Sequence, residues 1–356
     1  LAARLLGEQE VDPGVDLSAP AFVALESSSD ARAYKDMSDV KGQPEAKRAL
    51  EIAAAGGHHV ALLGRAGVGK TLLAERLPGI LPNLDDEQAL EVTSIHQLSG
   101  RLDSAGTGLA RCAPWFAPHH TASRAAMVGG GSDNRPSIGM VSLAHHGVLF
   151  LDEAAEFEPS VLDALREPLE SGSVTIARAG FQLCLPADFQ LVLATNPCPC
   201  GNALDTHRGA VCRCTPTQRR KYLSRLSGPL LDRVDVRVVL TRPSLASLEA
   251  DVVGDTSGQI AARVQQARDC IRQRLVGTGW SLMVQVPAEQ LATRWPLSPS
   301  SRQRLDSASR KDSMRGRDRV VRVAWSIAAL AGREEPTAAD IDAAIELRAS
   351  EQQWAA

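Results

Sequence analysis

"HVALLGRAGVGKTLLAERL", residues 59–77, is the stretch that decides the fold of this chain. The apolar run at 60–63 is typical of a buried strand, and good helix formers follow Thr71. Between them lies the pattern Gly-x-x-x-x-Gly-Lys-Thr, in the strand, glycine turn and helix order that a phosphate-binding P-loop requires. The stretch therefore predicts an α/β nucleotide-binding core with a parallel sheet.

The residue types of this loop suit the binding of a nucleotide. Glycines let backbone N–H groups wrap phosphates at the start of a helix. Lys70 is expected to reach the β- and γ-phosphates, and the Thr71 hydroxyl to hold Mg²⁺. ATP and Mg²⁺ are therefore the predicted ligands. The predicted phosphate-binding residues are Gly64, Arg65, Ala66, Gly67, Val68, Gly69, Lys70 and Thr71.

Two further strands end in polar side chains that fit the same site. "GVLFLDEAAEF" predicts a strand ending at Asp152, which is placed to support Mg²⁺, and Glu153, which is placed to polarise a water for attack on the γ-phosphate. "FQLVLATNP" predicts a third strand ending at Asn196, whose amide could orient that water. Alone, Asn196 would be read as the start of a turn before Pro197.

Composition limits what the chain can be. Its 356 residues, 44% of them hydrophobic, allow two or three domains with buried cores. No secretory signal or membrane-spanning run is present, so we expect a reducing, cytoplasmic location. The chain lacks an initiator Met, which leads us to expect a fragment of a longer protein. A net charge of −3 does not indicate a nucleic-acid partner, so any binding to nucleic acid must come from local basic patches.

The residues after about 242 predict a helical domain. Apolar residues recur at helical spacing in 257–275, 300–311 and 317–330, and Thr337 is a plausible N-cap of a last helix, with Asp340 three residues on. These segments predict an α-helical lid. Residues 302–322 hold eight Arg or Lys against three Asp. That excess is either a DNA-facing patch or a solvated helical face.

Several long blocks together resemble one family. They are "DVKGQPEAKRALEIAAAGGHHVALLGRAGVGKT", "APHHTAS", "MVGGG", "SLAHHGVLFLDEAAEF", "LREPLESGSVTIARAGFQLCLPADFQLVLATNPCPCG" and "RLSGPLLDRVD". Over about 36–348 the chain is similar to the magnesium-chelatase-like AAA+ ATPases of the ComM (YifB) type. The resemblance implies a ring ATPase of the helix-2-insert clade, usually a hexamer. It also implies three regions: 1–30 as the end of a Lon-protease-like domain, 31–242 as the AAA+ core and 243–356 as the lid.

The resemblance also implies roles for single residues. Asn196 would be sensor 1, and Arg233 in "LLDRVD" would be the arginine finger that reaches the γ-phosphate in the neighbouring subunit. Arg315 matches sensor 2, with Arg319 as the second candidate. The "DVKGQ" segment would flank the adenine, with Val40 and Gln43 nearest.

Two inserts bear on the partner that the resemblance implies. Residues 112–136 resemble the helix-2 insert, and 172–186 the hairpin before sensor 1, where alternation around Ala179-Gly180 predicts two strands and a turn. In related ring motors this hairpin contacts DNA, so Arg178 near its tip is a candidate DNA contact. A surface hairpin with one exposed Arg is the alternative. Where relatives have Arg-Pro-Phe-Arg, this chain has "APWF" at 113–116, which weakens any phosphate contact by the first insert.

Three functions fit the resemblance. The leading one is an ATP-driven motor on DNA, a helicase for branch migration during recombination or natural transformation. The second is a chelatase-type remodelling ATPase that drives metal insertion by a partner, and the third is a nucleotide-dependent scaffold. DNA-stimulated ATPase activity separates the first from the other two.

The loop "NPCPCGNALDTHRGAVCRC", 196–214, gathers Cys198, Cys200, Cys212 and Cys214. Four thiolates suit the tetrahedral site that zinc prefers, and His207 could replace one of them. The C-x-C spacing argues against zinc, since paired ligands are usually two to four residues apart. Free thiols and, in a reducing compartment, the less favoured disulfides remain the alternatives.

Overall fold

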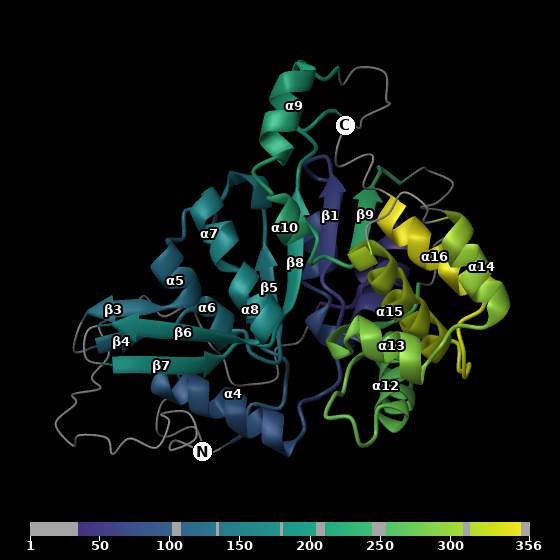
Figure 1. Ribbon diagram of the computed structural model, residues 1–356. Coiled ribbons are helices and arrows are strands. Elements are labelled where there is room, and N and C mark those ends of the chain that lie inside the picture. The colour runs from purple at the N-terminus through teal and green to yellow at the C-terminus, as the bar shows by residue number, and fades with distance from the viewer. Residues whose placement is uncertain are drawn as a thin grey trace. The chain divides into compact units, whose positions relative to one another are not determined.

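The computed structural model describes residues 35–101, 108–132, 135–178, 181–203, 211–243, 254–308 and 314–349 (Figure 1). The chain divides into two compact units. The first unit comprises the described parts of 83–151 and 156–190. The second comprises those of 34–82, 152–155 and 191–356. The sequence blocks that carry the predicted nucleotide site, 64–71, 152–153 and 196, all belong to the second unit.

A five-stranded sheet has the order β2-β5-β8-β1-β9. The strands are β2 (Trp115–Phe116), β5 (Val148–Leu151), β8 (Gln190–Thr195), β1 (Val60–Gly64) and β9 (Val236–Leu240). β1 pairs in parallel with β8 on one side and with β9 on the other, and β2 pairs in parallel with β5. Strands β1, β5 and β8 are buried throughout, as their continuous apolar runs predict. The prediction of an α/β P-loop core is confirmed.

Helices of the second unit pack around one apolar cluster. Its members come from α2 (Pro44–Gly56), α12 (Ser257–Arg274) and α15 (Met314–Leu330), and include Ala55, Ile271 and Trp325. The predicted lid helices therefore share a core with the helix that precedes β1. The remaining elements of this unit are η1 (Met37–Asp39), α3 (Lys70–Ala74), η2 (Pro78–Ile80), α9 (Pro216–Leu223), α10 (Gly228–Leu231), η4 (Met283–Gln285), α13 (Ala288–Arg294), α14 (Pro299–Ala308) and α16 (Ala338–Ala349).

The predicted start of the last helix is confirmed by its hydrogen bonds. The backbone N–H of Thr337 donates to the Asp340 carboxylate at 2.8 Å. In return, the backbone N–H of Asp340 donates to the Thr337 hydroxyl at 3.4 Å. These reciprocal bonds satisfy N–H groups that the first turn of α16 leaves without a helical partner.

A buried polar network ties the lid helix α15 to the start of β9. Asp235, 1% exposed, accepts from His58 Nδ1 at 2.9 Å and from Arg319 Nη1 at 2.8 Å. His58 Nε2 lies 2.8 Å from the Ser326 hydroxyl, also on α15. Burial alone would raise the pKa of Asp235, but the hydrogen bond from His58 and the charge of Arg319 hold it below its usual range. The carboxylate is therefore ionised inside the protein.

The first unit contains two antiparallel hairpins. One is β3 (Gly130–Ser132) with β4 (Arg135–Ser137), and the other is β6 (Ser173–Arg178) with β7 (Phe181–Pro186). The second lies where alternation around residue 179 predicts two strands. The other elements are α4 (Asp86–Leu98), α5 (Arg124–Val128), α6 (Met140–Leu143), η3 (Ala154–Glu156), which continues from 154–155 of the second unit, α7 (Pro159–Ala164) and α8 (Arg166–Ser171).

Among the residues that the structure describes, no helix is both long and apolar enough to cross a membrane.

Candidate active site

The phosphate loop has the backbone shape that its glycines allow. β1 ends at Gly64 and α3 begins at Lys70. Between them Gly67 has φ +76° and Gly69 has φ +100°, in the left-handed region where glycine is favoured. A Cβ at Gly67 would meet no atom within 4 Å, so this glycine is required by backbone conformation rather than by crowding.

Lys70 is held by three acceptors. Its side chain is buried, and its ammonium donates to the carbonyls of Gly64 at 2.7 Å and Arg65 at 3.0 Å, and to Asn196 Oδ1 at 3.0 Å. Burial lowers the pKa of Lys70, while the charges of Asp152 and Glu153 act in the opposite direction. The structure thus brings together the predicted phosphate-binding lysine and the amide at the end of β8.

Thr71 and Asp152, the two residues predicted to hold Mg²⁺, are hydrogen-bonded to each other. The Thr71 hydroxyl donates to Asp152 Oδ2 at 2.7 Å, and the backbone N–H of Glu153 donates to Asp152 Oδ1 at 2.9 Å. A hydroxyl beside a carboxylate is the kind of oxygen donor set through which Mg²⁺ is held together with phosphates, so these residues fit that ion. Bound there, Mg²⁺ would offset phosphate charge.

Glu153 has an unusual backbone. Its φ is +49°, a left-handed conformation that costs a non-glycine residue of order 1–3 kcal/mol. Such residues gather at functional sites. The strained position next to Asp152 agrees with the predicted role of Glu153 as the group that polarises water.

Of the two residues expected near the adenine, Gln43 contacts the phosphate loop. Val40 is buried. Gln43 also has a left-handed backbone, with φ +60°, and its side-chain amide donates to Thr241 O at 2.7 Å and to Val68 O at 3.4 Å. Gln43 therefore links the segment before α2 to the phosphate loop. Contact with adenine remains a prediction.

The three arginines expected to sense nucleotide have different surroundings. Arg233 follows α10 and donates to Pro229 O at 2.6 Å. Arg315 is exposed in the first turn of α15. Arg319, the second candidate for sensor 2, is engaged by the buried Asp235. Arg315 is thus the more exposed of the two candidates, and its role as sensor 2 stays a prediction. The backbone of Arg178 ends β6, but its side chain lies outside the described residues.

Several basic side chains of the stretch 302–322 form ion pairs or hydrogen bonds within the chain. Arg304 pairs with Asp342, and Arg317 with Asp306. Arg322 is mostly buried and donates to Val286 O at 2.9 Å. With Arg319 on Asp235, four of the six basic side chains that the structure describes in this stretch have internal partners. These contacts favour a structural use of the stretch.

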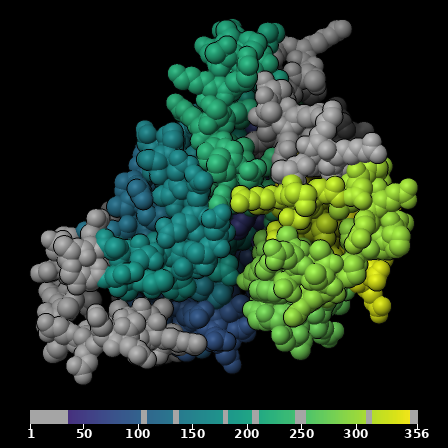
Figure 2. Space-filling model, in the orientation of Figure 1, coloured from purple at the N-terminus to yellow at the C-terminus, as the bar shows by residue number. Residues whose placement is uncertain are grey.

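A second basic segment was missed by the sequence analysis. Residues 211–231 hold five Arg or Lys and no acidic residue: Arg213, Arg219, Arg220, Lys221 and Arg225. Three of these lie on α9, whose side chains are mostly exposed and which forms the green surface at the top of Figure 2. In the sequence, the run "QRRK" is the pattern that could have indicated this basic segment.

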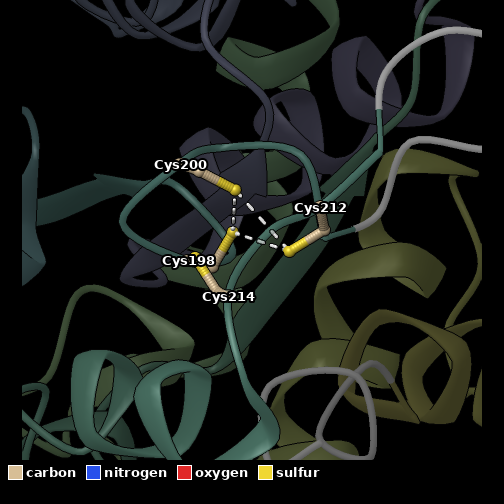
Figure 3. A group of neighbouring side chains, drawn as sticks. All are labelled: Cys198, Cys200, Cys212 and Cys214. Atoms are coloured by element: carbon tan, nitrogen blue, oxygen red, sulfur yellow. Dashed lines mark hydrogen bonds between the residues drawn. The ribbon is translucent and has the colours of Figure 1, made fainter.

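The four cysteines of the 196–214 loop converge (Figure 3). The Sγ–Sγ distances are 3.4 Å for Cys198–Cys200, 3.7 Å for Cys198–Cys212 and 3.6 Å for Cys200–Cys212. One sulfur from each of the four lies within 4.8 Å of every other. None is disulfide-bonded. Burial raises the pKa of Cys198 to about 12, whereas backbone N–H groups of Asn202 and Arg213 lower that of Cys200 to about 6.

Glu91, His145 and His146 form a second cluster with metal-ligand chemistry, also missed by the sequence analysis. Nε2 of His145 and of His146 lie 3.2 and 2.8 Å from Glu91 Oε2. The backbone N–H of Asp188 donates to His145 Nδ1 at 3.0 Å, so in a neutral ring the proton is on Nε2, which donates to Glu91. A metal at Nε2 would need that lone pair, so we assign a hydrogen-bonded cluster. Hydrogen bonds from His145 and then His146 lower the pKa of Glu91 to about 2.

The sequence of the chain matches known families and proteins. A family model described as magnesium chelatase, subunit ChlI, matches residues 36–248, and one described as its C-terminal part matches 254–348. An uncharacterized protein of Mycobacterium tuberculosis is 47% identical over 318 residues, which are 88% of this chain and 61% of that protein.

Two further relatives have names of their own, YifB and ComM. YifB of Escherichia coli is 48% identical over 235 residues, 66% of this chain and 45% of the relative. Competence protein ComM of Haemophilus influenzae is 41% identical over 303 residues, 84% of this chain and 57% of the relative. The chain thus spans roughly half to three fifths of the length of these relatives.

Proposed function

The chain belongs to the magnesium-chelatase-like AAA+ ATPase family, with relatives YifB and ComM, and from that premise we propose that it is an ATP-driven motor acting on DNA. ATP is bound at the phosphate loop with Mg²⁺ and hydrolysed there. The resulting movement drives translocation on DNA, with branch migration as the helicase activity.

One observation carries the ATPase part of this proposal. Lys70 contacts Asn196, and Thr71 contacts Asp152, so three separate stretches of sequence meet at one point. Lys70 and the loop amides would hold phosphate oxygens, and Glu153 would polarise the attacking water. Asn196 would orient that water, because its amide already lies 3.0 Å from the lysine that binds the phosphates.

DNA is proposed as the partner for two reasons. The relative ComM of Haemophilus influenzae is named a competence protein. The 211–231 segment presents exposed cations without acidic neighbours in sequence, which suits sequence-independent contact with phosphates. Arg178 on the β6–β7 hairpin is a further proposed contact. In the same proposal the protein forms an ATP-promoted ring, usually of six subunits, in which Arg233 of one subunit completes the site of the next.

The experiment that tests the proposal is ATP turnover with and without single-stranded and branched DNA. We expect DNA to stimulate turnover by the wild-type protein, with no turnover by Lys70→Ala. A triple variant, Arg219→Gln, Arg220→Gln and Lys221→Gln, should reduce DNA affinity and the salt dependence of binding. Turnover that DNA leaves unchanged would contradict the motor and favour a chelatase-type remodelling ATPase.

A further inference from the structure

We propose that Cys198, Cys200, Cys212 and Cys214 bind one zinc ion, and that this ion fixes the loop that follows Asn196 beside the phosphate loop. Nothing in the resemblance or in the comparisons assigns a metal to these residues. The proposal stands on their geometry (Figure 3). The link to nucleotide binding rests on the proposed ATP site, whereas the zinc site does not.

The sulfur positions fit a single tetrahedral ion. Zinc binds thiolates at about 2.3 Å, so the edges of a tetrahedral site are about 3.8 Å long. The three separations among Cys198, Cys200 and Cys212, 3.4, 3.6 and 3.7 Å, lie close to that edge, and all four sulfurs lie within 4.8 Å of one another. An iron–sulfur cluster would place several atoms between opposite thiolates and spread them further apart. A disulfide would need a separation of about 2.05 Å.

The surrounding backbone supports a charged tetrathiolate. The N–H groups of Asn202 and Arg213 point at the Cys200 sulfur, that of Ala203 at Cys198, and that of Cys200 at Cys214. Such outer hydrogen bonds orient thiolates and offset their charge in metal sites. Cys198 is buried while Cys200 is exposed. The protein therefore covers the site on the side of Cys198, and a metal ion can enter from solvent on the side of Cys200.

The same loop adjoins the nucleotide site at two points. Asn196, which holds Lys70, lies two residues before the first ligand. Gly201 follows the second ligand with φ +78°, and a Cβ there would lie 3.9 Å from the backbone nitrogen of Ala66 in the phosphate loop. A metal that closes 198–214 therefore restricts both segments. We expect removal of zinc to weaken nucleotide binding.

The first test is metal content of the full chain purified without chelator. We expect about one zinc per chain and no iron. With a thiol reagent, Cys112, Cys184 and Cys270, which are exposed and outside the cluster, should react first. The other four thiols should react only as zinc is released to a colorimetric chelator. Zinc below about one tenth per chain, with seven thiols reacting together, or iron in place of zinc, would overturn the proposal.

The second test uses matched variants. Cys200→Ser and Cys214→Ser should lose zinc, whereas Cys184→Ser and Cys270→Ser should retain it. If the first pair fails to fold, cobalt exchange into the wild-type protein gives the readout instead: a tetrathiolate site produces intense visible bands, and their absence contradicts the site. Titration with a fluorescent ATP analogue then separates the claim of a zinc site from the claim that zinc strengthens nucleotide binding. Loss of zinc with unchanged ATP affinity would retain the site and reject its coupling to the phosphate loop.

Discussion

At the scale of residues, the candidate active site depends on a few hydrogen bonds that side chains make with backbone carbonyls and with one another. Lys70 is buried and makes three of them, and Thr71 and Asp152 make one with each other. Glu153 differs from them in its strained backbone, with φ +49°, between the end of β5 and the start of η3. Binding and hydrolysis should therefore be separable by mutation.

Substitution of Glu153 should separate ATP binding from ATP hydrolysis. Glu153→Gln keeps the size of the side chain but removes the general base, so ATP should bind while turnover falls by about 100-fold or more. Lys70→Ala should remove binding itself. Glu156→Gln, an exposed carboxylate three residues on, is the matched control and should stay near wild type. Near-normal turnover by Glu153→Gln, measured by phosphate release, would show that another group acts as the base.

Acid should destabilise the protein through His96. Burial lowers the pKa of His96, whose Nε2 donates to Leu143 O at 2.9 Å. As pH falls through about 6.5, the unfolded chain binds this proton more readily than the folded chain, so stability is present above that pH and declines below it. The decline is at most about 1.4 kcal/mol per pH unit for one proton.

Urea unfolding between pH 7.5 and 5.5 measures this effect. His96→Gln can still donate to a carbonyl but cannot titrate, so its free energy of unfolding should depend less on pH. His119→Gln, at an exposed histidine, should keep the wild-type slope. Equal slopes for all three proteins would assign the pH dependence to other groups, such as the Glu91 cluster.

At the scale of elements, sequence patterns predicted the individual strands and helices, because each depends on residues that are close together in the sequence. The apolar runs before Gly64 and Asp152 are buried strands, and helical periodicity located the C-terminal helices. Contacts between distant residues outside the phosphate-loop site and the cysteine loop were not predicted, because no local pattern encodes them. His58 meets Asp235 and Ser326 only in the fold. The four cysteines of the 196–214 loop were predicted as a possible zinc site although their C-x-C spacing is unusual for zinc, and the fold brings their sulfurs together.

The contact between α15 and the start of β9 should be costly to break. Asp235→Asn leaves the Arg319 charge without its buried partner, a loss of about 3–5 kcal/mol by analogy with other buried pairs. The exposed Asp232, in the same short segment, offers Asp232→Asn as the control, with an effect within about 0.5 kcal/mol. Chemical unfolding gives both values. Equal stability of the two variants would mean that the pair contributes nothing.

At the scale of the whole molecule, the proposed ring makes each active site depend on two subunits. Arg233 would act on the neighbouring site, where an arginine finger is worth about 1000-fold or more in rate. Arg233→Ala and Lys70→Ala proteins should each be inactive alone. Mixed in equal amounts they should recover turnover, because some interfaces combine an intact Lys70 with an intact Arg233. Full activity of a wild-type monomer at high dilution would contradict this arrangement.

The register of β1 has a consequence for how the chain folds as it is made. Val60 pairs with Val192 on one side and with Val236 on the other, so both neighbours of β1 are translated long after it. At ~5–20 residues per second, the ribosome needs on the order of ten seconds to deliver the first of them. During that interval an apolar strand without its partners is open to wrong pairing. We therefore expect the strand that leads into the phosphate loop to stay open to wrong pairing until the residues around 192 have been made.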